Sequence, residues 1–427
     1  MIFSNKQHNA LLFLAASLML AGPAQAEDWQ YQFTGHLKGR VVADAYPDNS
    51  LFYDYAGSSA FDTEAALRLN FAAHKGGWSL EADYQLFATY GESVEYSRDL
   101  PAAGGLVNTR LPNDNRRLFN LTDELVDDGK FAALQRLDRL WVSYAGDKTV
   151  IRLGRQAITW GNGFFFSPMD IINPFDPTAV DTEYKAGDDM IYGQYLRNNG
   201  HDIQAAVVFR RNPITGDTES SQDTAAIKYH GIVGDSEFDL LLADSYGDTT
   251  LGFGANRSLG GAVWRGDVVL TEVDSSLIVQ LVTNINYSWV WHGKNMSGVL
   301  EYYYNGFGIK GGEYDAASIA ANPDLVERIA RGEIYTLGRN YLAGGVTIEV
   351  TPLWTVTPNF FANLQDGSAY LQFVTQNSLG NNFTFLGALN IPLGPAGTEY
   401  GGIETGLAPD QYLSTAFGVF TQLAWYF

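Results

Sequence analysis

The sequence predicts an all-β protein, a transmembrane antiparallel β-barrel of about eighteen strands, with fourteen or sixteen strands as smaller alternatives. Three observations predict this class: an export signal at the N-terminus, no later apolar run long enough for a helical span, and a final strand with one apolar face. Bilayers are crossed only by α-helices or closed β-barrels, because every backbone polar group must be paired within the protein. An exported chain of this kind is therefore either a membrane barrel or a periplasmic β-protein, and we favour the barrel.

The N-terminal segment has the parts of a secretory signal. Lys6 precedes an apolar run over residues 10–21, and residues 24–26 read Ala-Gln-Ala, which is an A-x-A cleavage site. The apolar run is shorter than the roughly 20 residues that a membrane-spanning helix needs. We expect residues 1–26 to be a cleaved signal peptide and residues 27–427 to form the barrel.

The last eleven residues alternate between apolar side chains and small or polar ones, which is the period of a β-strand. The apolar face carries Phe417, Val419, Leu423, Trp425 and Phe427. A terminal strand with an apolar face and a final Phe resembles the strand by which bacterial outer-membrane barrels are recognised and closed. We therefore expect Trp425 and Phe427 to be an assembly signal read by the barrel-assembly machinery, and we expect the bacterial outer membrane, with its lipid and lipopolysaccharide, as the location.

The composition is consistent with this class. The chain has 24 Tyr, 25 Phe and 9 Trp but no Cys, which suits strands flanked by aromatic girdles and excludes disulfides and thiolate metal sites. A formal net charge of -21 argues against nucleic acid as a partner. The acidic exterior could bind the divalent cations that bridge lipopolysaccharide, although acidic side chains in solvated loops are the simpler explanation.

Alternating apolar and polar residues mark the remaining strands. The predicted strands are residues 31–42, 62–71, 78–86, 137–145, 149–159, 190–196, 202–210, 224–233, 237–245, 250–255, 262–272, 277–291, 297–305, 341–350, 354–364, 369–376, 383–391 and 417–427. Residues 250–255 are short and rich in Gly, and they could instead form a loop. An even number of strands follows if both chain ends lie in the periplasm.

Three connections between these strands are long. The first, residues 93–136, contains a helix-like stretch at residues 122–134. The second is predicted to hold a short helix, because Asn322 is a candidate N-cap, Pro323 follows it, and Gly332 can end the helix. The third, residues 160–189, is rich in Pro and Asp but carries three consecutive Phe residues, which are poorly suited to a freely solvated loop.

A family resemblance is found immediately before the third connection. Residues 152–161 read Arg-Leu-Gly-Arg-Gln-Ala-Ile-Thr-Trp-Gly. This stretch resembles the R-x-G-R-Q-x-x-x-W-G segment of a group of proteobacterial outer-membrane barrels that is distantly similar to alginate-export-type porins. The resemblance implies an outer-membrane channel or an envelope-export component, with the Arg-Gln strand and the following loop near the pore. It supplies no substrate, and the lack of a strong Arg and Lys excess on the predicted inner faces argues against an alginate-like polyanion.

The predicted inner faces carry both signs of charge. The side chains expected to line the pore are Lys38, Arg40, Glu64, Arg68, Glu81, Asp83, Arg152, Arg265, Asp267 and Glu301. Opposed charges across a water-filled constriction would orient polar solutes, whereas paired charges would fill a narrow or plugged lumen; both interpretations stay open. Arg155 would face lipid in a regular strand, so it must lie near an interface or be turned inward by a bulge at Gly154.

The constriction itself is predicted from the third connection, which we expect to fold inward and narrow the lumen. The residues expected to form the constriction are Phe164, Phe165, Phe166, Asp181, Glu183, Asp188 and Asp189. Fixed carboxylates at a constriction would concentrate cations. The same acidic loop could hold Ca²⁺ through oxygen ligands, although its spacing matches no defined calcium motif. We expect no other cofactor.

The sequence predicts a channel rather than an enzyme. The five His residues beyond the predicted signal are scattered, and no nucleophile elbow, zinc motif or phosphate-binding loop accompanies them. We expect an outer-membrane channel for polar or amphiphilic solutes, or an envelope-export component. The alternative is a non-conducting barrel that acts in adhesion, envelope assembly or lipid handover to a periplasmic partner.

Overall fold

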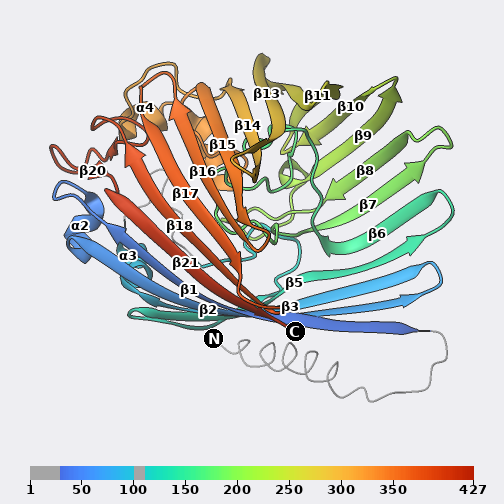
Figure 1. Ribbon diagram of the computed structural model, residues 1–427, viewed down its shortest axis with the longest axis horizontal. Helices are drawn as coiled ribbons and strands as arrows, with labels where there is room; N and C mark the ends of the chain where they lie inside the picture. Colours follow the sequence, from blue (N-terminus) through green and yellow to red (C-terminus); the bar gives the residue numbers. More distant parts are fainter. Residues whose placement is uncertain (1–28, 101–110) are drawn as a thin grey trace.

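The computed structural model describes residues 29–100 and 111–427 and is a closed antiparallel β-barrel (Figure 1). Nineteen strands form one sheet, and β4 pairs only with β5, which leaves eighteen strands in the ring. The last of them, β21, pairs with β18 on one side and with β1 on the other, and this second pairing closes the ring. The predicted fold class and strand number are confirmed.

The ring strands follow one another in chain order, and each is antiparallel to its neighbours. They are β1 (Gln30–Ala45), β2 (Ser59–Lys75), β3 (Trp78–Gly91), β5 (Phe131–Ala145), β6 (Thr149–Gln156), β7 (Asp188–Leu196), β8 (Asp202–Val208), β9 (Thr224–Val233), β10 (Ser236–Ser245), β11 (Asp248–Leu259), β12 (Ala262–Val273), β13 (Ser276–Trp291), β14 (Lys294–Asn305), β15 (Asn340–Thr351), β16 (Trp354–Asn363), β17 (Ala369–Ser378), β18 (Phe383–Leu393) and β21 (Phe417–Tyr426). The Gly-rich segment that could have been a loop is the strand β11.

The barrel has its apolar side chains on the outside. On β21, Leu423 and Trp425 are exposed, whereas Ala424 between them is buried. On β12, the inward Asp267 and Thr271 are buried, and the outward Trp264 is exposed. Period-two alternation therefore gives a lipid-compatible outer face and a polar inner face, the reverse of a soluble sandwich.

The two ends of the barrel differ in their connections. At one end, here named the turn end, strands are joined by short turns such as residues 234–235 and 292–293. At the other end, here named the loop end, most connections are longer, and the longest described in full there spans residues 306–339. Two connections at the loop end, residues 246–247 and 274–275, are tight turns. Both residues of the turns at 246–247, 274–275 and 292–293 have positive φ, the pattern of a type I′ hairpin turn. Both β1 and β21 have their free ends at the turn end.

The loop end carries the remaining elements. They are α2 (Leu51–Ala56), α3 (Glu92–Asp99), β4 (Thr122–Asp128), the 3₁₀ turn η1 (Ser220–Gln222), α4 (Ala316–Ala320), α5 (Pro323–Arg331), β19 (Ile403–Glu404) and β20 (Tyr412–Leu413). The helix predicted after Asn322 is confirmed as α5, and Gly332 ends it in the left-handed region with φ 71°. Within the described ranges, the helices are too short or too polar to serve as membrane spans.

The helix predicted at residues 122–134 is wrong. This stretch is instead a hairpin, in which β4 pairs with the first residues of β5. The turn follows Asp128 and places Gly129 at φ 53°. The loop-end part of β3 requires a hydrogen-bonded neighbouring strand, and Ala132, Ala133 and Leu134 of β5 provide it. Pairing with a distant strand therefore overrides the local helical pattern, and β5 begins at Phe131 rather than at residue 137.

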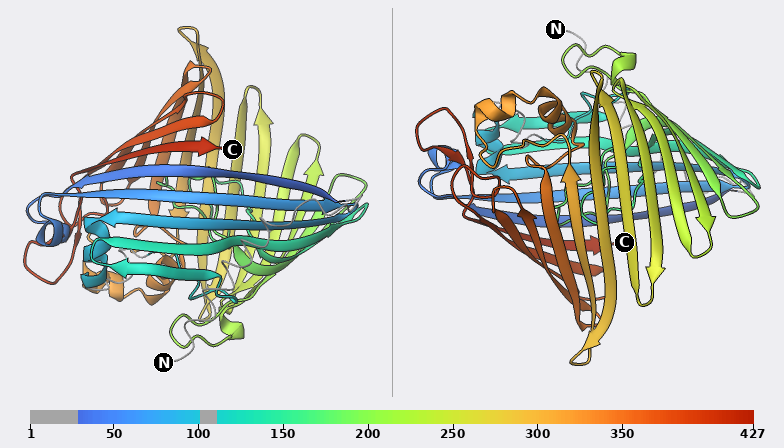
Figure 2. Two further views of the ribbon diagram at one scale, coloured as in Figure 1. Left: turned by 90° about the horizontal axis from the view of Figure 1, so that it is seen from below. Right: turned by 90° about the horizontal axis from the view of Figure 1, so that it is seen from above.

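The seam of the barrel is the pairing of β1 with β21, which Figure 2 shows side by side. It runs in register from His36 opposite Tyr426 to Ala45 opposite Phe417. Beyond the strand, Phe427 exchanges two backbone hydrogen bonds of 2.9 and 3.0 Å with Gly35. A side chain at Gly35 would collide with the Phe427 ring, because an added Cβ would lie 2.8 Å from it.

Deleting residues 425–427 should abolish assembly. The deletion removes the lower part of the seam, including both Gly35 hydrogen bonds, and leaves backbone groups unpaired at membrane depth. We expect no heat-modifiable barrel in outer-membrane fractions, measured as the mobility shift of boiled against unboiled protein on gels. Trp291→Leu, which changes an exposed aromatic residue on β13, is the control and should assemble. Normal amounts of folded truncated protein would contradict the role of this strand in closure.

Candidate functional site

The connection between β6 and β7, residues 157–187 and here named the inner loop, lies inside the barrel (Figures 1 and 2). Its hydrogen bonds fix this placement, because they reach strands on the far side of the ring from β6 and β7. The strands contacted are β12, β13, β14, β17, β21 and β1. A segment that touches this series of inner faces passes through the enclosed lumen.

Glu301 on β14 is the anchor of the first half of the inner loop. Its carboxylate accepts hydrogen bonds from the backbone N–H groups of Phe164, Phe165 and Phe166 at 2.5, 2.9 and 2.7 Å, and a fourth from the Asn284 side chain at 3.0 Å. Glu301 is fully buried. A charged acceptor that satisfies three successive amides holds this turn of the loop against the wall.

The three Phe rings of the inner loop have different surroundings. Phe166 is buried and stacks on Tyr303, with ring centroids 4.7 Å apart. Phe165 packs edge-on against Phe361 at 5.1 Å. Phe164 is 57% exposed. Two of the three rings are therefore packed against the inner wall, and only Phe164 is largely exposed.

The second half of the inner loop is held by ion pairs at the seam. Asp181 accepts from Lys38 at 2.7 Å and from Arg40 at 2.5 Å. Glu183 pairs with Lys38 at 2.7 Å and accepts from the hydroxyl of Tyr426 at 3.0 Å. The loop therefore contacts both strands of the seam from inside the barrel.

A charged network continues along the wall from this point. Arg40 also pairs with Glu64 at 2.6 Å. Arg68 pairs with Asp83 and with Asp138, each at 2.8 Å, and Arg136 and Arg139 also bind Asp138, at 2.6 and 3.0 Å. A polar cavity of about 250 Å³ lies between this network and the loop. The Tyr184 ring covers the Arg68 guanidinium at 3.9 Å.

Arg155 is buried rather than lipid-facing. Its guanidinium binds Asp114 at 2.8 Å and Asp189 at 2.9 Å. The preceding Gly154 has φ 119°, and an added Cβ there would lie 2.2 Å from the carbonyl oxygen of Leu140. Alternating burial along β6 ends at this glycine, and Arg155 and Gln156 are both buried. The neighbouring Asp188 pairs with Arg210 at 2.9 Å.

The remaining residues predicted to line the pore are spread over other parts of the wall. Arg152 lies 4.4 Å above the Trp141 ring, and Glu81 is opposite Trp141 in the strand register. Asp267 holds the inner loop by accepting from the backbone and side chain of Asn162, both at 2.7 Å. Arg265 is half-buried and is not brought together with the Lys38 and Arg68 network.

The charges around Lys38, Arg40 and Arg68 are thus arranged as neighbouring pairs and not as two opposed rows. Of the two interpretations left open by the sequence, this geometry corresponds to paired charges along the wall. Sequence reasoning missed several members of the network, above all Asp114, Arg136, Asp138 and Arg210. Asp114 and Arg136 lie in the long connection that was predicted to contain a helix, and correct assignment of β5 would have placed Arg136 on a strand. Asp138 lies in the predicted strand 137–145, but the sequence did not identify its Arg partners.

The acidic residues of the inner loop, and Asp188 and Asp189 at the start of β7, do not gather into a metal-binding cluster. Asp181 and Glu183 bind cations of β1, Asp188 binds Arg210 and Asp189 binds Arg155. No group of three or more His, Cys, Asp or Glu side chains suited to a metal ion occurs within residues 29–100 and 111–427. Binding of Ca²⁺ stays a prediction, and the carboxylates of the inner loop would have to leave their present partners to achieve it.

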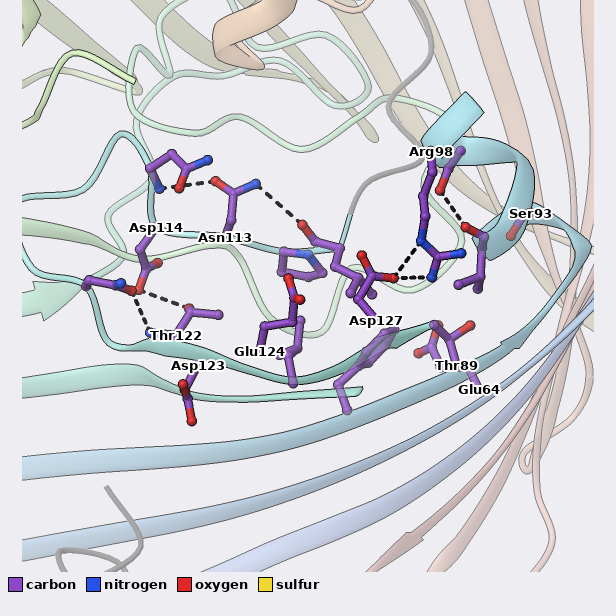
Figure 3. Close-up of a pocket in the computed structure, with 18 residues that line it drawn as sticks. Glu64, Thr89, Ser93, Arg98, Asn113, Asp114, Thr122, Asp123, Glu124 and Asp127 are labelled. Atoms are coloured by element: carbon purple, nitrogen blue, oxygen red, sulfur yellow. Dashed lines mark hydrogen bonds and ion pairs between the residues drawn. The ribbon is translucent and has the colours of Figure 1, made fainter. Parts of the chain in front are cut away.

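A larger cavity of about 660 Å³ lies nearer the loop end, between the inner faces of β3 to β5, helix α3 and residues 111–124 (Figure 3). Asp114 accepts from Thr122 on one side of it, and Arg98 of α3 pairs with Asp127 of β4 on the other. Its lining also includes Glu64, Asp123 and Glu124. The lumen therefore retains polar, predominantly acidic space between the wall and α3.

A closed eighteen-stranded barrel with an apolar outer face and a loop folded into its lumen defines a porin-like outer-membrane β-barrel. The chain is similar to solved structures of this kind. It aligns with OccAB1 of Acinetobacter baumannii over 95% of this chain and 99% of that one, with TM-score 0.53 and 8% identity. It aligns with OccAB4 of the same species over 95% of this chain and 100% of that one, with TM-score 0.52 and 9% identity. It aligns with OccK5 (OpdH) of Pseudomonas aeruginosa over 94% of this chain and 98% of that one, with TM-score 0.51 and 6% identity.

At these identities the likeness shows the fold alone. No protein-family model and no curated protein matches the sequence.

Replacing Glu301 with Gln should loosen the inner loop. A Gln side chain has one acceptor oxygen, so at least one amide of residues 164–166 loses its partner, at a cost of about 2 kcal/mol. We expect chymotrypsin to cleave folded Glu301→Gln barrels within the inner loop faster than wild type, with fragments identified by mass spectrometry. Glu272→Gln, an exposed carboxylate on β12, is the matched control. Equal cleavage rates in all three proteins would refute the anchoring role.

Replacing Asp181 with Asn should shift ion preference toward anions, because Lys38 and Arg40 lose their shared counter-charge. A unit charge about 7 Å from an ion in water changes its energy by roughly 0.6 kcal/mol, about threefold in concentration. The measurement is the reversal potential in a KCl gradient across a planar bilayer. Asp147→Asn, in a turn at the turn end, is the control, and an unchanged reversal potential for Asp181→Asn would place Asp181 away from the ion path.

The effect of Asp181 should persist in acid. Burial would raise the pKa of Asp181, which lies on the inner loop, but the Lys38 hydrogen bond and the charges of Lys38 and Arg40 outweigh burial and lower the pKa to about 2. A lowered pKa means that the ionised form, and its contribution to stability, is present above pH 3.8 and is lost only as the pH falls toward 2. The difference between wild type and Asp181→Asn should therefore be the same at pH 7 and pH 4.

Proposed function

We propose that this protein is an outer-membrane channel that passes small polar solutes along a lumen narrowed by the inner loop. The observation that carries the proposal is the path of the inner loop. It follows the inner wall and is fixed to it at β12 to β14, at β17 and at the seam. A polar cavity of about 250 Å³ remains beside it, and one of about 660 Å³ remains between β3 to β5 and α3. A wall-bound loop restricts the cross-section without requiring a separate plug domain.

In this proposal, Lys38, Arg40, Arg68 and their carboxylate partners line the restricted passage. Because most of these charges are already paired, the passage would present both cationic donors and anionic acceptors of hydrogen bonds. The net electric field across it would be small. Such a lining suits neutral, zwitterionic or amphiphilic solutes better than a polyanion. The similarity of residues 152–161 to alginate-export-type barrels therefore supports a proposed role in the envelope, and we do not extend it to an alginate-like substrate.

The surroundings of the channel complete the proposal. The N-terminal signal directs export, the outer face meets lipid and lipopolysaccharide, and the seam strand is presented to the barrel-assembly machinery. The loop end would face the exterior and the turn end the periplasm, which is the usual orientation of such barrels. We assign no catalytic role.

One observation favours the second candidate, a non-conducting barrel that acts in adhesion, envelope assembly or lipid handover. The connection over residues 306–339 has its own apolar core at the loop end, in which Tyr314, Ile319 and Leu325 are buried. This core covers part of the mouth and could serve as a docking platform. Single-channel recording of the refolded protein decides between the two, because only the first candidate requires steady conductance.

Deleting residues 164–183 should widen the channel. The deletion removes the Phe triplet and the segment that crosses the lumen, while β6, β7 and the seam strands stay intact. We expect a higher unit conductance in planar bilayers and faster uptake of antibiotics that wild type admits poorly. Heat-modifiability is the control for assembly. If a well-folded deletion variant conducts as wild type does, the loop does not limit the pore and the non-conducting candidate gains support.

A further inference from the structure

A second cavity of about 660 Å³ lies at the loop end, and it shares no lining residue with the cavity between β3 to β5 and α3. It is enclosed by the inner loop, by the connection over residues 306–339 and by the connection between β18 and β21. The inner wall contributes Tyr370 of β17. None of the contacts that form the charged network around Arg68 extends into this cavity.

Aromatic rings form much of its lining. Phe166 of the inner loop, Tyr335, Tyr370 and Tyr400 all face it. Tyr370 and Tyr400 lie with ring centroids 5.8 Å apart, and the Tyr335 hydroxyl donates to the backbone oxygen of Pro174 at 3.1 Å. The rings therefore come from four separate segments and are held in place by the fold.

Two carboxylates share this cavity, and their hydrogen-bond partners are neutral. Glu399 accepts from the Tyr341 hydroxyl at 2.5 Å, from the Asn363 amide at 2.7 Å and from the backbone N–H of Leu337 at 2.9 Å. Asp176 accepts from the backbone N–H and the hydroxyl of Thr178, both at 2.8 Å. Within the part of the chain that the structure describes, the cavity lining includes no Lys, Arg or His.

Elsewhere in the lumen, Asp181, Asp138 and Asp189 are matched by Arg or Lys. Glu301 and Asp267 also have neutral partners, but these partners hold the inner loop. Burial, followed by the charges of Glu399 and Asp176, raises the pKa of the Tyr400 hydroxyl, so both carboxylates act on the same ring. Burial also raises the pKa of Glu399 to about 7. Glu399 is therefore only partly ionised near neutral pH, and a cation bound beside it would favour its ionised form, because no Lys, Arg or His among the lining residues supplies that positive charge.

We propose that this cavity binds a small organic cation with a quaternary or primary ammonium group. Aromatic faces attract ammonium groups through their quadrupoles, and quaternary ammonium is recognised by aromatic cages in this way. Asp176 supplies a counter-charge, and a bound cation would favour the ionised form of Glu399, whose carboxyl oxygens have lone pairs beyond those used by its three donors. A divalent metal ion fits less well, because the described residues offer no group of three acidic or imidazole ligands here. The proposal rests on the proposed channel function and names one class of solute that the channel would admit.

The test uses the purified, refolded full-length protein and isothermal titration calorimetry. Choline is the probe, and its uncharged isostere 3,3-dimethylbutan-1-ol is the matched control ligand. We expect choline to bind and the alcohol to bind at least about tenfold more weakly, because only choline gains the charge interactions. Equal binding of the two compounds, or no binding of choline, would overturn the proposal.

Variants locate the binding. Asp176→Asn and Glu399→Gln should each weaken choline binding by about tenfold, while Asp147→Asn at the turn end should leave it unchanged. The Asp176 side chain is hydrogen-bonded to Thr178 within its own loop, so its variant tests the site even if Glu399→Gln fails to fold. Full affinity in a folded Asp176→Asn protein would overturn the assignment to this cavity.

Calorimetry needs no ionic current, so this proposal and the channel can fail separately. Choline binding without conductance would support the site and count against the channel. Conductance in KCl without choline binding would support the channel and overturn the site.

Discussion

Closure of the ring by hydrogen bonds between β1 and β21 is the interaction on which the rest of this structure depends. At membrane depth there is no water to satisfy a free N–H or C=O, and each unpaired group costs several kcal/mol. The register of the seam, from His36 opposite Tyr426 to Ala45 opposite Phe417, also determines which side chains face inward. A slip of one residue would turn Lys38 and Arg40 toward lipid and Leu37 and Val41 into the lumen. The inner-wall charges, and with them the position of the inner loop, follow from that register.

The features that sequence can predict here are those with a local period. Alternation identifies the strands and their outward faces, and the Asn-Pro start with a Gly end identifies α5. The hairpin of β4 and β5 was missed because its strands are determined by a partner distant in sequence, since Leu134 pairs with Phe87. The residues between Thr122 and Leu134 carry charges spaced as on a helix, and only the unpaired edge of β3 requires them to be extended.

The candidate site divides in the same way. Period-two alternation places Lys38 and Arg40 on the inner face, but it cannot identify Asp181 as their partner, because Lys38 and Asp181 are 143 residues apart. Arg155 shows the limit most clearly. Its inward placement depends on the positive φ of Gly154. Glycine adopts positive and negative φ about equally readily, so the neighbouring residues do not predict which one it takes. Glu301 was predicted to face the lumen, whereas its bonds to three successive amides follow only from the path of the loop.

The inner loop also links the two strands of the seam from inside the barrel. Glu183 pairs with Lys38 on β1 and accepts from Tyr426 on β21, so one side chain joins the first and last strands of the ring independently of their backbone ladder. Linkage is reciprocal: whatever stabilises the docked loop stabilises the closed seam by the same free energy, and a closed seam favours the docked loop equally. Lateral opening of a barrel would occur at the seam, and the seam is where the inner loop of this protein is bound to the wall. A barrel in which the inner loop is not docked therefore has a less stable β1–β21 seam.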